Sequence, residues 1–462
     1  MMRCGFWAVL SFLLVTSFPP GNAVPFPTQK PEATWHSPEY HILPPLREQA
    51  DIQNKWTEER RARIPGILRK YGIDAWLVSQ REYAEETVFW SLKSATQFSA
   101  RRRTTMLFLA DPSRGTPTSY TWTDNTAQVW TELRAVLATH VPKTIAINTH
   151  PEIAFSSGLH AGELEALRQG LGQEWASRFM CEPMLAVEYI ATMPRGRTEW
   201  YRRLQLTAWA MISEAFSESV IQPGLSTTTD VEWWLRDKLR QMNYTTWFHP
   251  DVSIIDEHTW DLSTSGKSRR RGGKIISHGD MLHVDFGLTA LGMNTDTQHL
   301  AYVLYPGDSD DQIPSGLREG LRKGNRAQDI VKSNMKVGRP GNEILKASLE
   351  QMRDEGIEGK VYCHPIGDWG HSAGTLIGMT NLQDGVPILG ELPLLPDTYY
   401  SIELLVKHFV PERNATLSFP LEEDVIWSPV DSSWTWAFAR QDRFHLVQSS
   451  SSVRSSQLHR DL

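Results

Sequence analysis

Residues 283–304 read HVDFGLTALGMNTDTQHLAYVL and predict two antiparallel strands joined by a turn. A turn centred on Ala290 and Leu291 places Asp285 opposite Asp296. Directly opposed residues of a hairpin have Cβ atoms about 4.5–5.5 Å apart, so both carboxylates would project from one face. If they are buried, such a pair needs a cation or a retained proton, whereas a solvated pair needs neither.

Three later segments add ligand-type side chains to this pair. They read HPIGDWGH at 364–371, YYSIELLV at 399–406 and LEEDVI at 421–426. Glu403 lies between Ile and Leu in a β-prone segment, which is a costly position for a carboxylate unless something pairs with it. Two Asp, two Glu and one His form an oxygen-rich set that suits Mn, Zn, Co or Fe in a hydrolytic role. The lack of a thiolate argues against a structural zinc site.

The composition is that of an ordinary soluble globular protein. The chain has 462 residues, a formal net charge of −7, 40% hydrophobic and 22% charged residues, and three cysteines. These values exclude a wholly disordered chain and a small disulfide-framework protein, and the mild acidity gives no general attraction to nucleic acid. At roughly 100–200 residues per domain, we expect two or three domains.

Both ends of the chain have the composition of segments outside the folded domains. Residues 1–23 have a basic start, a short apolar run and small residues before a cleavage point, so they predict a secretory signal and a secreted, extracellular protein. The apolar run is shorter than the roughly 20 residues of a membrane span, and no later segment supplies one, so no membrane partner is expected after signal removal. Residues 24–50 predict an extended leader, and residues 448–462 predict a Ser-rich tail.

Removal of the signal takes Cys4 away and leaves Cys181 and Cys363 in the mature chain. In an oxidising compartment these two residues either form one disulfide or remain two buried thiols, and the sequence favours neither state. The sequons at Asn243 and Asn414 fit a secreted glycoprotein.

Periodicity divides the remaining chain into two predicted domains. Residues 51–188 alternate helical and strand patterns and predict an α/β layer. The pattern then changes to a long helix from Thr198, and residues 189–447 form the second predicted domain, which holds every candidate site residue. The expected elements of the first domain are a helix at 52–71 and strands at 75–78, 105–110 and 144–148.

In the order and spacing of these motifs, the chain resembles the M24 metallopeptidases, which include methionine aminopeptidases, Xaa-Pro aminopeptidases and prolidases. The family pattern is an Asp-Phe/Ala-Gly strand, a second Asp, a His-x-x-Gly-x-x-x-His loop, a Glu after Ile, and a last Glu in an Ile-Glu-Asp-like strand. The resemblance implies an α+β fold in which a creatinase-type α/β N-terminal domain, absent from methionine aminopeptidases, precedes a pita-bread catalytic domain. The metal ligands that it implies are Asp285, Asp296, His364, Glu403 and Glu422.

Two ligand assignments have alternatives. His371 lies in a Gly-His-x-x-Gly sequence that also matches the ligand motif, but the His-x-x-Gly-x-x-x-His spacing favours His364 as ligand and gives His371 the role of second histidine. Glu423 directly follows Glu422 in a Leu-Glu-Glu-Asp-Val run, and the resemblance favours the first of the two.

The chain also departs from the family pattern. The family usually has another His before the first Asp, where this chain has a basic loop at 267–274, and His258 would fill that place only if the loop is an insertion. Pro420 stands where prolidases have an Arg, and Leu-Leu follows Glu403 where Pro-Gly is common. Metal binding is little affected, whereas specificity for proline dipeptides is left open.

The resemblance implies two divalent metal ions, Mn in preference to Zn or Co, and a bridging water that attacks a carbonyl. Glu403 would transfer the proton and His371 would stabilise the tetrahedral species. The leading hypothesis is a secreted aminopeptidase that hydrolyses N-terminal Xaa-Pro bonds. The alternatives are a hydrolase or lyase on the same fold that acts on a small amide or metabolite, and a binding protein with an inactive site. The expected partner is therefore a peptide or small amide and not nucleic acid, and a homodimer is expected by analogy with relatives.

Overall fold

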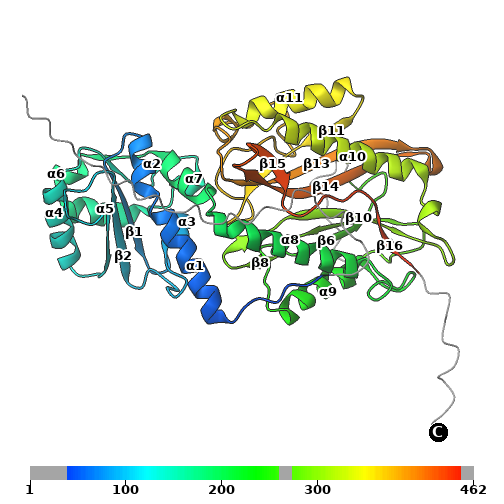
Figure 1. Cartoon of the computed structure of the whole chain (residues 1–462), viewed down its shortest axis with the longest axis horizontal. Coiled ribbons are helices and arrows are strands. Elements are labelled where there is room, and N and C mark those ends of the chain that lie inside the picture. Colours follow the sequence, from blue (N-terminus) through cyan, green and yellow to red (C-terminus); the bar gives the residue numbers. More distant parts are fainter. Residues whose placement is uncertain (1–38, 260–272, 449–462) are drawn as a thin grey trace, which may run out of the picture. The chain divides into compact units, whose positions relative to one another are not determined.

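The computed structural model describes residues 39–259 and 273–448 (Figure 1). Contacts join the described residues into one compact unit. The predicted signal, most of the leader, most of the basic loop at 267–274 and nearly all of the Ser-rich tail lie outside the described residues. No helix in the described ranges is long and apolar enough to cross a membrane.

The first sheet has five strands among the described residues, in the order β3-β2-β1-β4-β5 (Figure 1). β1 pairs antiparallel with β2 and parallel with β4, which in turn pairs parallel with β5. The strands predicted at 75–78, 105–110 and 144–148 correspond to β1, β2 and β4. The bounds are β1 Ala75–Arg81, β2 Arg103–Leu109, β3 Ser119–Thr123, β4 Ile145–Ala146 and β5 Phe179–Met180.

Helices cover both faces of this sheet. Successive residues of β1 point to opposite sides, so the strand contributes side chains to a core on each face. Trp76 and Val78 pack into a core with α2, α3 and α7, whereas Ala75 and Leu77 pack into a second core with α4 and α5. The sheet is therefore buried on both sides, as its nearly continuous apolar strands require. The helices are α2 Ile64–Lys70, α3 Thr87–Leu92, α4 Gln128–His140, α5 Ala161–Leu171, α6 Gln173–Ala176 and α7 Pro183–Ala191.

The single helix predicted at 52–71 is two helices in the structure. α1 spans Leu46–Arg61 and α2 begins at Ile64, with Pro65 in its first turn. Proline cannot donate a backbone hydrogen bond to the preceding turn, so it is tolerated at the start of a new helix and not inside a continuing one. The helical region thus begins inside the stretch predicted as leader.

The predicted domain boundary after residue 188 falls within α7 and stays a prediction.

The second sheet has nine strands among the described residues. The main path is β11-β13-β14-β10-β7-β6, with β12 paired to β13, β15 to β14 and β16 to β10. The longest pairing is the β13–β14 hairpin, which runs without interruption from its open end to the turn. The bounds are β6 Asp251–Ile254, β7 Met281–Phe286, β10 Thr297–Val303, β11 Glu358–Val361, β12 His364–Ile366, β13 Tyr399–Val410, β14 Ala415–Ser428, β15 Ser433–Trp436 and β16 His445–Val447.

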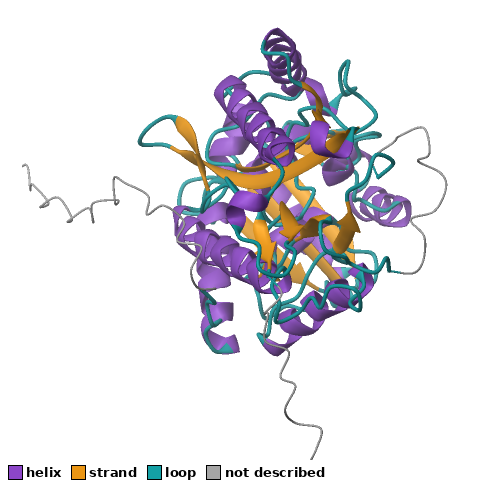
Figure 2. Ribbon diagram, turned by 90° about the vertical axis from the view of Figure 1, so that its right-hand side faces the viewer, coloured by secondary structure: helices purple, strands orange, loops and turns teal. Residues whose placement is uncertain are grey.

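Two pairs of helices cover this second sheet (Figures 1 and 2). Val284 and Phe286 of β7 pack into the core that contains residues of α8 and α9. Leu404 of β13 and Leu421 of β14 pack into another core, which contains residues of α10 and α11. The helices are α8 Arg195–Ala215, α9 Thr228–Gln241, α10 Ser315–Asn334 and α11 Gly341–Asp354.

The predicted register of the hairpin between β7 and β10 is wrong. The turn is centred on Leu291 and Gly292, one position later than predicted, between the short strands β8 Thr289–Ala290 and β9 Met293–Asn294. Leu291 and Gly292 have φ values of 54° and 68°. A two-residue turn with both central residues in the left-handed region matches the twist of a hairpin, which explains why Gly292 occupies a central position.

The later turn changes the partner of the first predicted ligand. Asp285 pairs with Gln298 and not with Asp296. Asp296 precedes β10 and lies two residues from the direct partner of Asp285. The two carboxylates are therefore diagonal neighbours, and the cluster is spread further along the strands than predicted.

Candidate metal centre

Alternation along the strands turns the acidic residues away from the two cores. Val284 and Phe286 of β7 pack toward α8, so Asp285 between them faces the other side of the strand. Leu404 of β13 and Leu421 of β14 pack in the core with α10, so the adjacent Glu403 and Glu422, which pair directly with each other, face away from it. β10 lies between β7 and β14, and its Gln298 pairs with Asp285 on one side and with Glu422 on the other.

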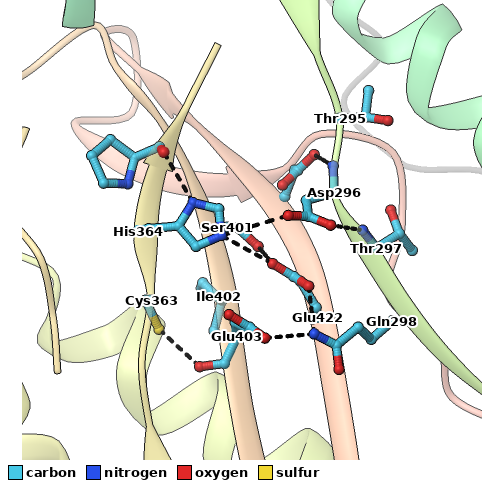
Figure 3. Close-up of polar contacts among 12 residues, drawn as sticks. Thr295, Asp296, Thr297, Gln298, Cys363, His364, Ser401, Ile402, Glu403 and Glu422 are labelled. Atoms are coloured by element: carbon cyan, nitrogen blue, oxygen red, sulfur yellow. Dashed lines mark hydrogen bonds and ion pairs between the residues drawn. The ribbon is translucent and has the colours of Figure 1, made fainter. Parts of the chain in front are cut away.

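Three of the predicted ligands form a compact group. Asp296, His364 and Glu422 each offer one ligand atom, and these atoms lie within 4.8 Å of one another. His364 Nε2 is 3.2 Å from Glu422 Oε1 and 3.6 Å from Asp296 Oδ2. The three side chains point toward one another from β12, β14 and the start of β10 (Figure 3). All three residues are buried, so water does not compensate their charges.

The two glutamates are joined by an amide. Gln298 Nε2 donates to Glu403 Oε1 at 2.6 Å and to Glu422 Oε2 at 2.8 Å (Figure 3). Ser401 Oγ also donates to Glu422 Oε1. Glu403 is therefore next to the compact group but is held by Gln298.

Asp424 is a functional candidate that the sequence analysis missed. Its Oδ2 accepts hydrogen bonds from the Asp296 backbone N–H at 3.1 Å, from Tyr201 Oη at 2.7 Å and from Gln205 Nε2. It thereby connects the backbone of one predicted ligand to α8. Its position two residues after Glu422, on the same face of a strand, is the signal that could have identified it.

The protonation properties of the group reflect crowded, buried carboxylates. Burial raises the pKa of Asp296 well above its ordinary value, and the charges of Glu422 and Asp285 raise it further. The pKa of Glu403 is raised by burial and by the same two neighbours. Burial alone would lower the pKa of His364, but its hydrogen bond to Glu422 and the charge of that residue outweigh burial, so the pKa is raised.

This donor set fits a divalent cation. Carboxylate oxygens and one imidazole nitrogen are ligands for Mn, Zn or Co, and a cation would neutralise charges that burial makes costly. Cys363 is not part of the set: its thiol is buried and donates to the Glu403 carbonyl at 3.4 Å, and burial raises its pKa. Cys181 and Cys363 are both free thiols, so the alternative of a disulfide between them is not realised.

The structure also places the alternative ligands. His371 lies outside the compact group, with its ring edge-on to His364 at a centroid distance of 4.7 Å, and it is exposed. The side chains packed against the ring partly desolvate the imidazole, and this desolvation, together with the charge of the neighbouring His364, lowers the pKa of His371 although the residue is exposed. Glu423 points elsewhere, because its Oε1 is 2.8 Å from His299 Nε2 and accepts from the Gln441 N–H at 2.9 Å.

Of the other candidates, His258 has a side chain 81% exposed and contacts Glu257 at 3.3 Å, so it lies at the surface and not in the group. Trp369, which lies between the two histidines in the sequence, packs against the core of the first sheet.

A buried ion cluster holds the loop between the two histidines. Asp368 pairs with Arg60 of α1 at 2.8 Å and also with Arg197 of α8. The exposed fractions of the three side chains are 7%, 2% and 6%. The Arg60 guanidinium also donates to the Ser91 carbonyl at 3.0 Å. These contacts fix the loop between β12 and His371 against α1 and α8.

Comparisons with known proteins agree with this geometry. Residues 200–426 match the model of a family described as Metallopeptidase family M24. The X-Pro aminopeptidase from Thermotoga maritima is similar in structure, with a TM-score of 0.56 and 15% identity over 81% of this chain and 98% of that chain.

Two further solved structures give a similar result. The Xaa-Pro dipeptidase from Bacillus anthracis has a TM-score of 0.53 and 15% identity over 84% of this chain and 99% of that one. The Pseudomonas aeruginosa aminopeptidase PepP has a TM-score of 0.56 and 13% identity over 87% and 97%. No curated protein sequence matches the chain. These likenesses confirm the predicted α+β fold.

Proposed function

We propose that this chain, a metallohydrolase with the pita-bread fold whose residues 200–426 match the model of Metallopeptidase family M24, is an aminopeptidase that hydrolyses N-terminal Xaa-Pro bonds. The observation that carries the proposal is the compact buried group of Asp296, His364 and Glu422. The similar structures support the proline-directed specificity, since they include an X-Pro aminopeptidase and an Xaa-Pro dipeptidase that are covered almost completely.

In the proposed reaction, some of these side chains bind the metal and another transfers a proton. Asp296, His364 and Glu422 would hold a divalent cation, with Asp285 and Glu403 beside them. A divalent cation bound there would lower the pKa of a water molecule and polarise the substrate carbonyl. Glu403, next to Glu422 on the paired strand, would accept a proton from that water and pass it to the leaving amine.

His371 has a different task in the proposed reaction. Its ring packs edge-on against His364 and Trp247, and the residue is exposed. From this position its N–H would donate to the oxyanion of the tetrahedral species. Asp368, held by Arg60 and Arg197, keeps the intervening loop in place and thereby positions both histidines.

Further properties are part of the same proposal. We expect two ions per chain, and Mn in preference to Zn or Co, because oxygen donors dominate the set. The predicted signal in residues 1–23 supports a secreted enzyme, and the analogy with relatives supports a homodimer.

The test is a peptide panel on the full chain after loading with Mn. Gly-Pro, Arg-Pro-Pro and the matched Arg-Ala-Ala are incubated with the enzyme, and the released N-terminal residue is quantified. Cleavage of the proline peptides is the expected result. The Asp296→Ala variant should lose bound metal and activity together, whereas Asp310→Ala, an exposed acid in the same half of the chain, should lose neither.

One position favours the alternative function, that of a hydrolase or lyase on the same fold that acts on a small amide or secondary metabolite. Pro420, on β14 opposite Leu405 of β13, cannot supply the charged side chain that prolidases have there. If no peptide in the panel is cleaved by protein with its full complement of metal, the peptidase proposal is wrong and a small-amide screen should reveal the activity.

A further inference from the structure

We propose that the buried cluster of Arg60, Arg197 and Asp368 is a binding site for a small monovalent anion, a halide such as chloride, held by the two guanidinium groups. The site does not depend on the proposed function, because neither a metal ion nor a substrate takes part in it. It goes beyond that function, since it assigns a ligand to a part of the molecule where the reaction requires none.

The first observation is an excess of positive charge in the interior. Arg60 and Arg197 both pair with Asp368, and no other carboxylate of the described residues forms an ion pair with either arginine. The side chains of Arg60, Arg197 and Asp368 are 2%, 6% and 7% exposed. Two buried cations thus share one buried anion, and an uncompensated charge in such a place is costly.

The second observation is a set of guanidinium nitrogens without acceptors. Each guanidinium group has five N–H donors and no acceptor. Arg60 uses Nη2, which donates to Asp368 at 2.8 Å and to the Ser91 carbonyl at 3.0 Å. Its Nε and Nη1, and the Nε of Arg197, are buried and have no hydrogen-bond partner in the described part of the chain. Because buried donors in native proteins are nearly always paired, these three nitrogens require a further acceptor.

Two neutral groups add to this set. Ser91 Oγ is buried without a partner, and it belongs to the residue whose carbonyl accepts from Arg60. The indole Nε1 of Trp369, the residue after Asp368, is buried and also lacks a partner within the described ranges. Both groups can donate to an anion.

Aromatic rings cover faces of the two guanidinium groups. The guanidinium carbon of Arg60 is 4.8 Å from the ring centroid of Tyr189, and that of Arg197 is 5.5 Å from the ring centroid of Trp56. These contacts are favourable for a cation but give no acceptor to the N–H groups in the guanidinium plane. The ligand therefore binds at the edges of the two groups.

Charge and donor chemistry together select the class of ligand. A water molecule would accept from one donor but would leave the excess charge in place, so the ligand is an anion. A halide suits a buried site better than a carboxylate or phosphate, because it presents one heavy atom to several donors at once.

The bound anion would join three parts of the fold. Arg60 belongs to α1, Arg197 to α8, and Asp368 to the loop between β12 and His371. Compensation of the excess charge would stabilise the folded chain, since a ligand that binds only the folded state raises its stability.

The experiment follows the thermal unfolding of the purified full chain while sodium chloride or sodium bromide replaces sodium gluconate at constant ionic strength. Gluconate serves as the reference because it is too large for a buried site. At a halide concentration of about one hundred times the dissociation constant, the unfolding temperature should rise by about 3–5 °C. Equal unfolding temperatures in the three salts would overturn the proposal.

Two matched variants locate the response. Arg197→Met removes one cation and leaves Arg60 and Asp368 as a neutral pair, so halides should raise its unfolding temperature no more than gluconate does. Arg318→Met makes the same change in a pair with Asp310 in which both side chains are largely exposed, and it should keep the full response. A full response in Arg197→Met would show that the halide binds elsewhere.

A crystallographic measurement keeps the proposal testable if Arg197→Met does not fold. Crystals of the full chain grown in sodium bromide should show an anomalous scattering peak in contact with the unpartnered nitrogens of Arg60 and Arg197, and the lack of such a peak would refute the site. Neither readout depends on catalysis. A chain that binds halide but cleaves no peptide would overturn only the proposed function, and a peptidase without a halide response would overturn only this site.

Discussion

At the scale of single residues, the adjacent Glu422 and Glu423 contact different groups, although the sequence alone barely distinguishes them. Glu422 joins His364 and Asp296, whereas Glu423 contacts His299 and the Gln441 N–H. We expect Glu422→Gln to weaken Mn²⁺ binding by more than about 100-fold, because it removes a charged ligand, and Glu423→Gln to weaken it by no more than about tenfold. Equilibrium dialysis of both variants against Mn²⁺ provides the measurement, and equal losses would contradict the assignment.

Asp368 is a second residue whose effect follows from its contacts. Burial alone would raise its pKa, but Arg197 and Arg60 outweigh burial and hold the pKa well below its ordinary value. Asp368→Asn leaves two buried guanidinium groups without their counter-charge, so we expect a loss of about 3–5 kcal/mol in the free energy of unfolding, measured by urea denaturation. The stabilisation by Asp368 is present above the ordinary pKa of an aspartate and is lost as the pH falls through the lowered value.

A matched control for Asp368 is available at the surface. Asp310 pairs with Arg318 at 3.2 Å with both side chains largely exposed. Asp310→Asn should change the free energy of unfolding by less than about 1 kcal/mol. If Asp368→Asn is no more destabilising than this control, the loop is not held by the buried ion cluster.

At the scale of elements, sequence patterns predicted the strands better than their pairing. The apolar runs of β1, β2 and β13 were identified because burial on a sheet face leaves a direct trace in composition. The turn at Leu291 and Gly292 was misplaced by one residue, because a non-glycine residue in the left-handed region has no strong sequence signal. This shift by one residue changes the partner of Asp285 from Asp296 to Gln298. The position of the Gln298 amide among the acidic side chains was therefore not predicted.

The first sheet provides a prediction at the same scale. Glu86 precedes α3 and is buried, and its carboxylate accepts from Gln80 of β1 at 2.7 Å and from Asn148 at 3.0 Å. Burial raises its pKa from the ordinary 4.5 to about 8, against the lowering effect of these two hydrogen bonds. The folded protein therefore holds a proton at Glu86 that the unfolded chain has lost.

The sign of the pH effect follows from this difference. The contribution of Glu86 to stability is full below the ordinary pKa and is lost as the pH rises toward 8, with a slope of up to about 1.4 kcal/mol per pH unit. Glu86→Gln has no proton to lose, so its free energy of unfolding relative to the wild type should rise between about pH 5 and 8. Urea denaturation at several pH values gives the two curves, and parallel curves would refute the buried protonated state.

At the scale of the whole molecule, contacts between residues far apart in the sequence could not be predicted from sequence patterns. Arg60 and Asp368 are separated by 308 residues, and neither lies in a segment whose periodicity marks it as buried. The compact group was predictable in its members, because the resemblance supplied their order along the chain. Asp424 and Gln298 were missed, because their roles depend on which strands are neighbours and in which register.

The route of the protein through the cell gives the last prediction. Asn243 and Asn414 are exposed and adopt left-handed φ values of 62° and 47°, and Asn414 lies in the connection between β13 and β14. Both acceptor amides are therefore accessible on the folded surface, as glycosylation of a secreted chain requires. Expressed in secreting eukaryotic cells, the protein should be released into the medium with Val24 as its first residue, and glycosidase treatment should lower its mass. Asn243→Gln and Asn414→Gln should each remove part of that difference, and the double variant should abolish it. Retention inside the cell with an intact N-terminus would contradict the secretory route and leave both asparagines unmodified.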